Sequence, residues 1–310
     1  MKEILEITNK KYVEILASIK EKINNIEIDA SEKNNLKMST DKLIRIYDRY
    51  FEADCIELIE NARSVYEIST KAVSLTEKAD LKDSYEKIDK PAKEQKDRPR
   101  DVRTFIKENF NKFFSVIEED LEFEKIAGKH ILDYLYGELS DFIHTTKVKE
   151  FVYVLLQNGK YEEFTTISTL MEMAESVMII HLDLINTKYQ IIEEEIEIFS
   201  KVFVFRLFVF LLYLIDNKEI AAEIMLEAGN FFEDNTNNLN IANVRKAASL
   251  YEIENLKNLI IEEVINKGIM KDLILEIGKV FTSEERKIIM VHLEKYIQLL
   301  ISLNEKNKKE

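Results

Sequence analysis

The residues whose types and spacing could support acid–base chemistry are concentrated in one short segment. Tyr136, Ser140 and His144 are spaced four residues apart, so they would lie on one face of a helix. This helix is predicted to end at His144, since Thr145 and Thr146 follow it. A histidine at a helix end, beside a hydroxyl group, can exchange protons near neutral pH. The alternative is a structural role, in which His144 hydrogen-bonds the last carbonyl groups of its own helix.

Other catalytic motifs are missing from the sequence. It contains no P-loop, no dinucleotide-binding glycine pattern, and neither the zinc-protease nor the serine-hydrolase motif. The histidines are not at metal-ligand spacing, and the lone Cys55 excludes a cysteine-based zinc site. We therefore expect no metal and no cofactor. His181 lies in an apolar stretch and is predicted to be a hydrogen-bonded core histidine.

The composition predicts that helices position these residues. Only 6 Gly and 2 Pro occur among 310 residues, whereas the turns of β-rich folds use both residues heavily. Abundant Leu, Glu and Lys favour helix by intrinsic propensity. We predict an all-α fold: a helical bundle in the N-terminal half and an additional helical array in the C-terminal half.

Apolar periodicity divides the N-terminal half into helices and loops. Residues 29–37 are predicted to be a loop, and Ser39, Thr40 and Asp41 are candidate caps for the helix that follows. The stretch 79–102 is rich in Lys, Asp and Glu, holds both prolines, and is predicted to be a charged loop. The predicted helices cover residues 1–26, 42–78, 104–119 and 122–144.

The C-terminal half shows further helical periodicity, and Thr282 to Glu285 resembles a capping box. A domain boundary is predicted near residue 150, which gives domains of residues 1–150 and 151–310. The predicted helices of the second domain cover residues 147–158, 161–199, 201–215, 218–233, 241–267, 270–281 and 283–303.

Charge and hydropathy limit the possible partners. The formal net charge of −14 excludes binding of a phosphate backbone through the overall field, so RNA would need a local basic patch. The lone cysteine and a charged N-terminal helix are typical of a cytoplasmic protein. The apolar run from Val202 to Ile215 is short for a bilayer and contains Arg206. We expect a buried core helix and no membrane span; the alternative is a membrane-acting effector that uses this run.

Two parts of the sequence resemble the HEPN superfamily (higher eukaryotes and prokaryotes nucleotide-binding domains). The pattern Tyr136-x-x-Leu139-Ser140-x-x-x-His144-Thr145 resembles the histidine-bearing helix end of that superfamily. The stretch from Asn61 to Ile68, which contains Arg63, resembles an arginine-and-glutamate stretch on a long early helix in the same branches. The order of predicted elements is also similar, and the resemblance covers about residues 40 to 150.

The resemblance implies a helical-bundle domain that often dimerises and, in many members, cleaves RNA without a metal. It implies that His144 assists proton transfer as the ribose 2′-hydroxyl attacks. Ser140 and Tyr136 would orient His144 or contact phosphate, and Arg63 would be a phosphate ligand. The family arginine that lies five to seven residues before the histidine is missing here, where residues 137–139 are Gly, Glu and Leu. The chain therefore resembles a divergent branch.

Two functional hypotheses follow from the sequence. The first is a HEPN-like effector, a metal-independent endoribonuclease acting in phage defence or in a toxin–antitoxin system. The second is a non-catalytic helical binding or dimerisation module in a multiprotein defence assembly, which the acidic charge and the missing motif arginine favour. Under both hypotheses we expect a homodimer or a partner protein.

Overall fold

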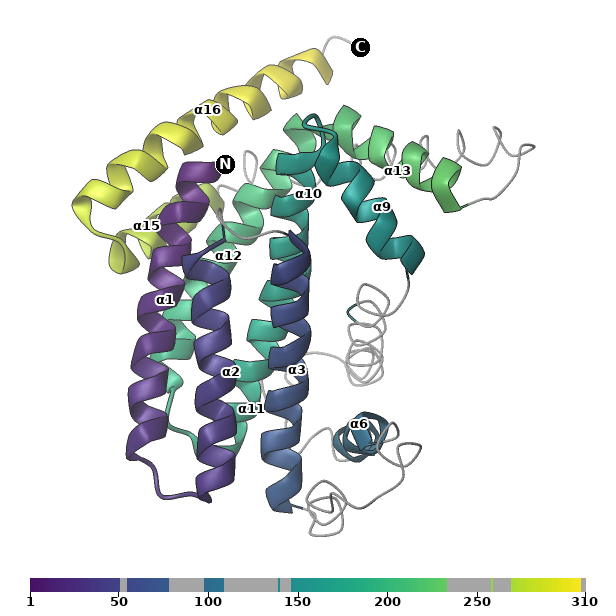
Figure 1. Ribbon diagram of the computed structural model, residues 1–310. Coiled ribbons are helices and arrows are strands. Elements are labelled where there is room, and N and C mark those ends of the chain that lie inside the picture. The colour runs from purple at the N-terminus through teal and green to yellow at the C-terminus, as the bar shows by residue number, and fades with distance from the viewer. Residues whose placement is uncertain are drawn as a thin grey trace. The chain divides into compact units, whose positions relative to one another are not determined.

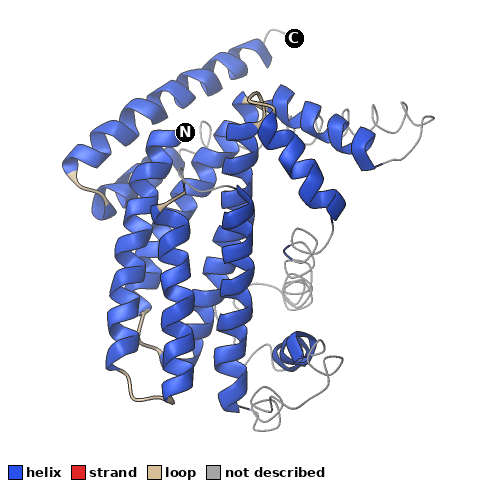
Figure 2. Ribbon diagram, in the orientation of Figure 1, coloured by secondary structure: helices blue, strands red, loops and turns tan. Residues whose placement is uncertain are grey.

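The computed structural model describes residues 1–50, 55–77, 98–108, 139, 146–232, 258 and 269–307. In this part of the chain all regular secondary structure is helical, as Figure 2 shows. The all-α prediction is therefore confirmed. The helix predicted over 122–144, apart from Leu139, and the helix predicted over 241–267, apart from Asn258, lie outside the described residues.

The chain divides into two compact units, each assembled from separate stretches of sequence. Unit 1 consists of residues 1–11, 150–165 and 197–310, and unit 2 consists of residues 12–149 and 166–196. One change of unit falls between Lys149 and Glu150, beside the predicted domain boundary. The division into sequence domains 1–150 and 151–310 stays a prediction.

Unit 2 is built around helix α3. It contains residues 12–25 of α1 (Lys2–Asn25), together with α2 (Ala30–Asp48), α3 (Cys55–Glu77), α6 (Arg98–Glu108), the π-helical turn η2 (Leu170–Ala174) and α11 (Glu175–Tyr189). Helices α2, α6 and α11 all pack against α3 (Figure 1). The rings of Tyr12 and Tyr47 meet edge to face with centroids 5.0 Å apart, which holds α1 against α2.

His181 links three helices in the core of unit 2, as a predicted core histidine should. Its side chain is fully buried on α11. The Thr40 hydroxyl donates to the Leu36 carbonyl at 2.8 Å, so its oxygen must accept from His181 Nε2, 3.0 Å away. The Ser69 hydroxyl then donates to His181 Nδ1 at 2.8 Å. Both ring nitrogens are therefore satisfied by a neutral imidazole, and the core-histidine prediction is confirmed.

Helix α2 begins earlier than the sequence predicted. The Asp29 carboxylate caps it by accepting the backbone N–H groups of Ser31 and Glu32 at 2.9 and 3.1 Å. The predicted loop over 29–37 and the predicted cap at residues 39–41 were therefore wrong. Hydroxyl groups at that predicted cap donate instead to carbonyl groups one turn earlier, so they lie inside the helix.

Two long predicted helices are divided in the structure. The helix predicted over 42–78 is interrupted, because α2 ends at Asp48 and α3 begins at Cys55. In the helix predicted over 161–199, α11 ends where Gln190 adopts a left-handed conformation with a φ of 53°. This left-handed residue ends α11 although neither Gly nor Pro lies at the helix end. The composition of the segment therefore does not indicate the break.

Helix α6 shortens the predicted charged loop. Residues 98–102 were predicted to close a loop over 79–102, but they form the first part of α6. Pro99 is compatible with this position, because a proline in the first helical turn removes no intrahelical hydrogen bond. The prediction was wrong for these five residues, and residues 79–97 lie outside the described residues.

Unit 1 contains residues 1–11 of α1, and its remaining described elements are all helices. Its helices are α9 (Thr146–Gln157, from residue 150), α10 (Glu162–Thr169, to residue 165), α12 (Glu193–Asp216, from residue 197), α13 (Lys218–Phe232), α15 (Ile269–Val280) and α16 (Ser283–Asn307). The predicted capping box is confirmed: Glu285 Oε2 accepts the Thr282 N–H at 2.8 Å, and Thr282 Oγ1 accepts the Glu285 N–H at 3.3 Å.

Helix α12 is the most apolar element among the described residues. It runs without a break through residue 200, where the sequence predicted one. Arg206 is fully buried on it and donates to Thr8 Oγ1 at 2.6 Å and to Asn9 Oδ1 at 2.7 Å, both on α1. By length and composition α12 could cross a membrane, and half of its most apolar window is buried inside the protein. A core helix has the same properties.

Candidate functional site

Arg63 is the one predicted site residue that lies within the described part of the chain. It occupies α3 and is only 7% exposed. Its guanidinium group donates from Nε and Nη2 to Glu67 Oε1, at 3.0 and 2.7 Å. Because Glu67 follows one turn later on the same helix, this ion pair lies within α3.

The surroundings of Arg63 are acidic. Glu57 and Glu60 are exposed on α3, and Glu67 is partly exposed. A phosphate that approached Arg63 along this face would meet carboxylates before it reached the guanidinium group. The arrangement is suited to stabilising α3, and it offers a phosphate little positive potential.

A second ion pair connects this face of α3 to α9. Lys149 Nζ lies 3.2 Å from Glu60 Oε1, and both side chains are partly exposed. Glu60 precedes Arg63 by three residues, so the two lie on neighbouring positions of one helix face. The N-terminal end of α9 is thereby held beside the part of α3 that carries Arg63.

Tyr136, Ser140 and His144 lie outside the described residues, so their predicted roles stay predictions. Within the segment 136–144 the structure describes Leu139 alone, which is helical and fully buried. An apolar residue at this position of the pattern therefore belongs to the core of unit 2.

The described residues contain no group of three or more His, Cys, Asp or Glu side chains that could hold a metal ion. Burial lowers the pKa of His181 from 6.5 to about 3, so this imidazole stays neutral at physiological pH. His181 is also fully buried, which removes it from any contact with a substrate in solution.

No protein-family model, curated protein or solved structure matches the chain. No family is therefore assigned. The resemblance to the HEPN superfamily stays a prediction that rests on the residues of the two motifs.

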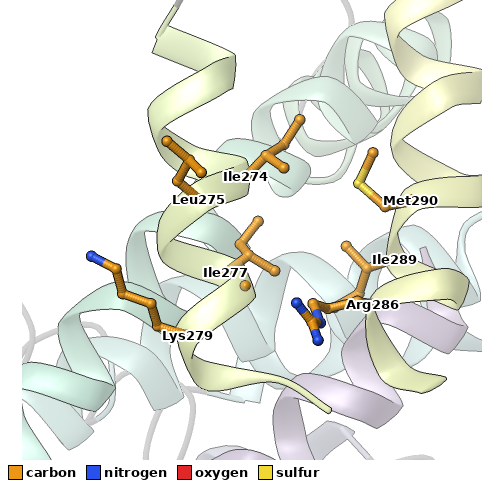
Figure 3. Close-up of a pocket in the computed structure, with 8 residues that line it drawn as sticks. Ile274, Leu275, Ile277, Lys279, Arg286, Ile289 and Met290 are labelled. Atoms are coloured by element: carbon orange, nitrogen blue, oxygen red, sulfur yellow. The ribbon is translucent and has the colours of Figure 1, made fainter. Parts of the chain in front are cut away.

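A groove between α15 and α16 is a surface feature that the sequence did not indicate. It has a volume of about 470 Å³. Figure 3 shows Ile274 and Ile277 of α15 on one side, Ile289 and Met290 of α16 on the other, and the Arg286 guanidinium group between the two helices. The described lining contains no carboxylate, histidine or cysteine, so the groove offers apolar contact and a positive charge rather than acid–base chemistry.

Exposed apolar side chains are the second feature that sequence reasoning missed. On an amphipathic helix the pattern does not distinguish a residue that faces the core from one that faces a partner. The sequence of α12 did contain a signal. A helix that is apolar on all sides is expected to be buried on all sides, either in its own protein or against a partner. Val204 and Leu207 on that helix are 54% and 40% exposed.

Proposed function

We propose that this chain is a non-catalytic helical module that binds a partner protein through unit 1. The observation that supports this most directly is the unequal distribution of exposed apolar side chains. Eleven large hydrophobic side chains are exposed among the described residues, and all but Met38 belong to unit 1. Those of unit 1 are Tyr153, Val154, Val204, Leu207, Met225, Leu275, Ile288, Met290, Val291 and Ile301.

Exposed apolar residues scattered singly are normal, but their concentration on one part of a protein is typical of a surface that binds another protein. Unit 2 has the opposite character: among its described residues Met38 is the one large hydrophobic side chain that is exposed, and its buried polar groups include the satisfied His181. Unit 2 would therefore supply a stable scaffold, and unit 1 would supply the contact surface.

The state of Arg63 agrees with a non-catalytic module. A phosphate ligand needs a positive charge that is open to the substrate, whereas Arg63 is buried and paired with Glu67. The acidic net charge of −14 adds to the cost of bringing a polyanion to this face.

The mass of the complex formed at native expression level tests the proposal. The protein would be tagged, purified gently from its own cells, and weighed by native mass spectrometry. A defined species heavier than the 36.5 kDa chain is expected. A chain that is recovered only as a monomer would contradict the proposal.

A metal-independent endoribonuclease is the second candidate function, and one observation favours it. Lys149 pairs with Glu60 beside Arg63, and only four residues separate Lys149 from His144 in the sequence. Because this connection is short, it supports the proposal that His144, the predicted general acid–base group, lies near the face of α3 that carries Arg63.

Cleavage of RNA by the purified protein tests this candidate. A ribonuclease of this kind would cleave RNA in the presence of EDTA, and His144→Ala would lose at least a hundredfold in rate. His292→Ala is the matched control, since His292 binds Glu3 on another helix and should not affect the rate. Equal rates for wild type and His144→Ala would exclude His144 from the reaction.

A further inference from the structure

The outward face of α16 is apolar at its centre. Ile288 and Val291 are 43% and 67% exposed, while Ile289, Leu293 and Tyr296 on the other face of the same helix are buried. Helix α16 therefore presents one apolar face to the core of unit 1 and a second, shorter one to the solvent.

Charged residues continue this outward face in both directions. Glu284 lies about one turn before Ile288, and Lys295 lies about one turn after Val291; both charged residues are exposed. The spacing along the face is four, three and four residues, which is the spacing of a coiled-coil seam. The seam therefore has an acid at one end, a base at the other end and two apolar residues between them.

A second pair of opposite charges lies along one side of this seam. Lys287 and Glu294 are both exposed, and they flank the apolar centre. None of the four charged residues, Glu284, Lys287, Glu294 and Lys295, makes an ion pair with a residue in the described ranges.

We propose that a second copy of this chain binds here, through antiparallel pairing of two α16 helices. A two-fold axis midway between residues 288 and 291 would place Ile288 of one copy against Val291 of the other. The same axis would place Glu284 opposite Lys295, because both lie equally far from it.

The self-complementary charge pattern is the reason for choosing a second copy over another partner. A two-fold interface uses the same patch on both chains, so each acid must meet a base at the mirrored position. Glu284 with Lys295 satisfies this condition, since the two residues lie equally far from the axis. A partner of a single charge sign would be repelled by one end of the seam.

The apolar centre is small, so the dimer is expected to be reversible, with a dissociation constant on the order of micromolar. The inference rests on the proposed function, because it names one partner of the unit 1 surface. It adds that this partner is the chain itself and that α16 forms the contact.

Analytical ultracentrifugation of the purified chain and of charge-reversal variants tests the pairing. Wild type is expected to change from monomer to dimer between about 1 and about 200 μM. Glu284→Lys and Lys295→Glu should each raise the dissociation constant tenfold or more, because each places like charges opposite one another. Glu305→Lys, the same change at an exposed position far along α16, is the matched control and should leave the dimer unchanged.

An equimolar mixture of Glu284→Lys and Lys295→Glu gives the sharpest result. Each variant supplies the charge that the other lacks, so the mixture should form a heterodimer although neither variant dimerises alone. Circular dichroism and thermal melting would show that both variants are folded. Recovery in the mixture requires residues 284 and 295 of two different copies to lie opposite one another.

Three results would overturn the inference: wild type that stays monomeric at every concentration, single variants that dimerise as well as wild type, or folded variants whose mixture stays monomeric. These results are distinct from failure of the proposed function. A complex that is purified from cells and lost in a Val204→Lys, Leu207→Lys variant would uphold the proposed function even if α16 does not pair.

Discussion

At the scale of single residues, His181 shows how the fold controls a titratable group. Its imidazole is fully buried between Thr40 and Ser69, and burial lowers its pKa to about 3. In the unfolded chain the same group has a pKa of about 6.5. As the pH falls below 6.5 the unfolded chain gains a proton that the folded chain does not, so the free energy of unfolding decreases.

The expected loss for this group is up to about 1.4 kcal/mol per pH unit between about pH 6 and pH 4. His181→Gln can keep one hydrogen bond but does not titrate, so its free energy of unfolding should decrease less steeply over this range. Urea denaturation at several pH values measures both slopes. His292→Gln is the control for a partly exposed histidine. Parallel slopes for wild type and His181→Gln would show that His181 does not cause the acid sensitivity.

Arg63 is the residue at which a structural role and a catalytic role can be separated. Arg63→Ala removes a buried aliphatic stem and two hydrogen bonds to Glu67, so we expect a loss of about 2 kcal/mol in the free energy of unfolding. Lys149→Ala breaks a more exposed ion pair nearby and should cost about 0.5 kcal/mol or less. An Arg63→Ala variant that keeps full stability but loses RNA binding would instead support the phosphate-ligand role.

At the scale of elements, capping decides where α2 begins. Asp29 accepts two backbone N–H groups, so Asp29→Ala should lower the free energy of unfolding by about 1 kcal/mol. Asp41, a cap candidate from the sequence, only forms an ion pair with Lys20 between partly exposed side chains, and Asp41→Ala should cost about 0.5 kcal/mol or less. Urea denaturation of both variants checks the order. A larger cost at Asp41 would contradict the helix boundary.

The elements also show what the sequence could and could not predict. Helices with clear apolar spacing were found to within one residue at each end for α1, α9, α13 and α15, and the start of α16 was found where its capping box predicted it. The polar stretch before Leu36 was interpreted as a loop because it has few apolar residues, yet it is helical and contributes a buried Leu36 to the core. The end of α11 depends on a left-handed Gln190, a conformation that glutamine rarely adopts and that composition does not signal.

The candidate site was predictable only in part, because the sequence does not show which side chains the neighbouring helices bury. The sequence identified Arg63 as a candidate phosphate ligand, and the structure shows that Arg63 binds Glu67 on the same helix. It did not reveal that Arg63 is buried, because burial depends on the helices that pack against α3. Outward apolar residues such as Val291 have the same sequence signature as core residues.

At the scale of the whole molecule, the two units differ in the kind of surface they present. Among the described residues, unit 2 exposes one large hydrophobic side chain, Met38, while the other exposed large hydrophobic side chains belong to unit 1. The charged Arg206 within the apolar part of α12 is also accounted for, because it is fully buried in unit 1 and donates to Thr8 and Asn9. The molecule is therefore suited to contact a partner with unit 1.

The central claim, that unit 1 binds a partner protein, is tested most directly by the mass of the native complex for two surface variants. The unit 1 variant carries Val204→Lys and Leu207→Lys, and the control carries Met38→Lys in unit 2, each at positions that are at least 40% exposed. We expect wild type and the Met38→Lys control to form the same complex, and we expect the unit 1 variant to stay folded but to lose the partner protein. A unit 1 variant that forms the complete complex, or a complex lost only in the Met38→Lys protein, would contradict the account.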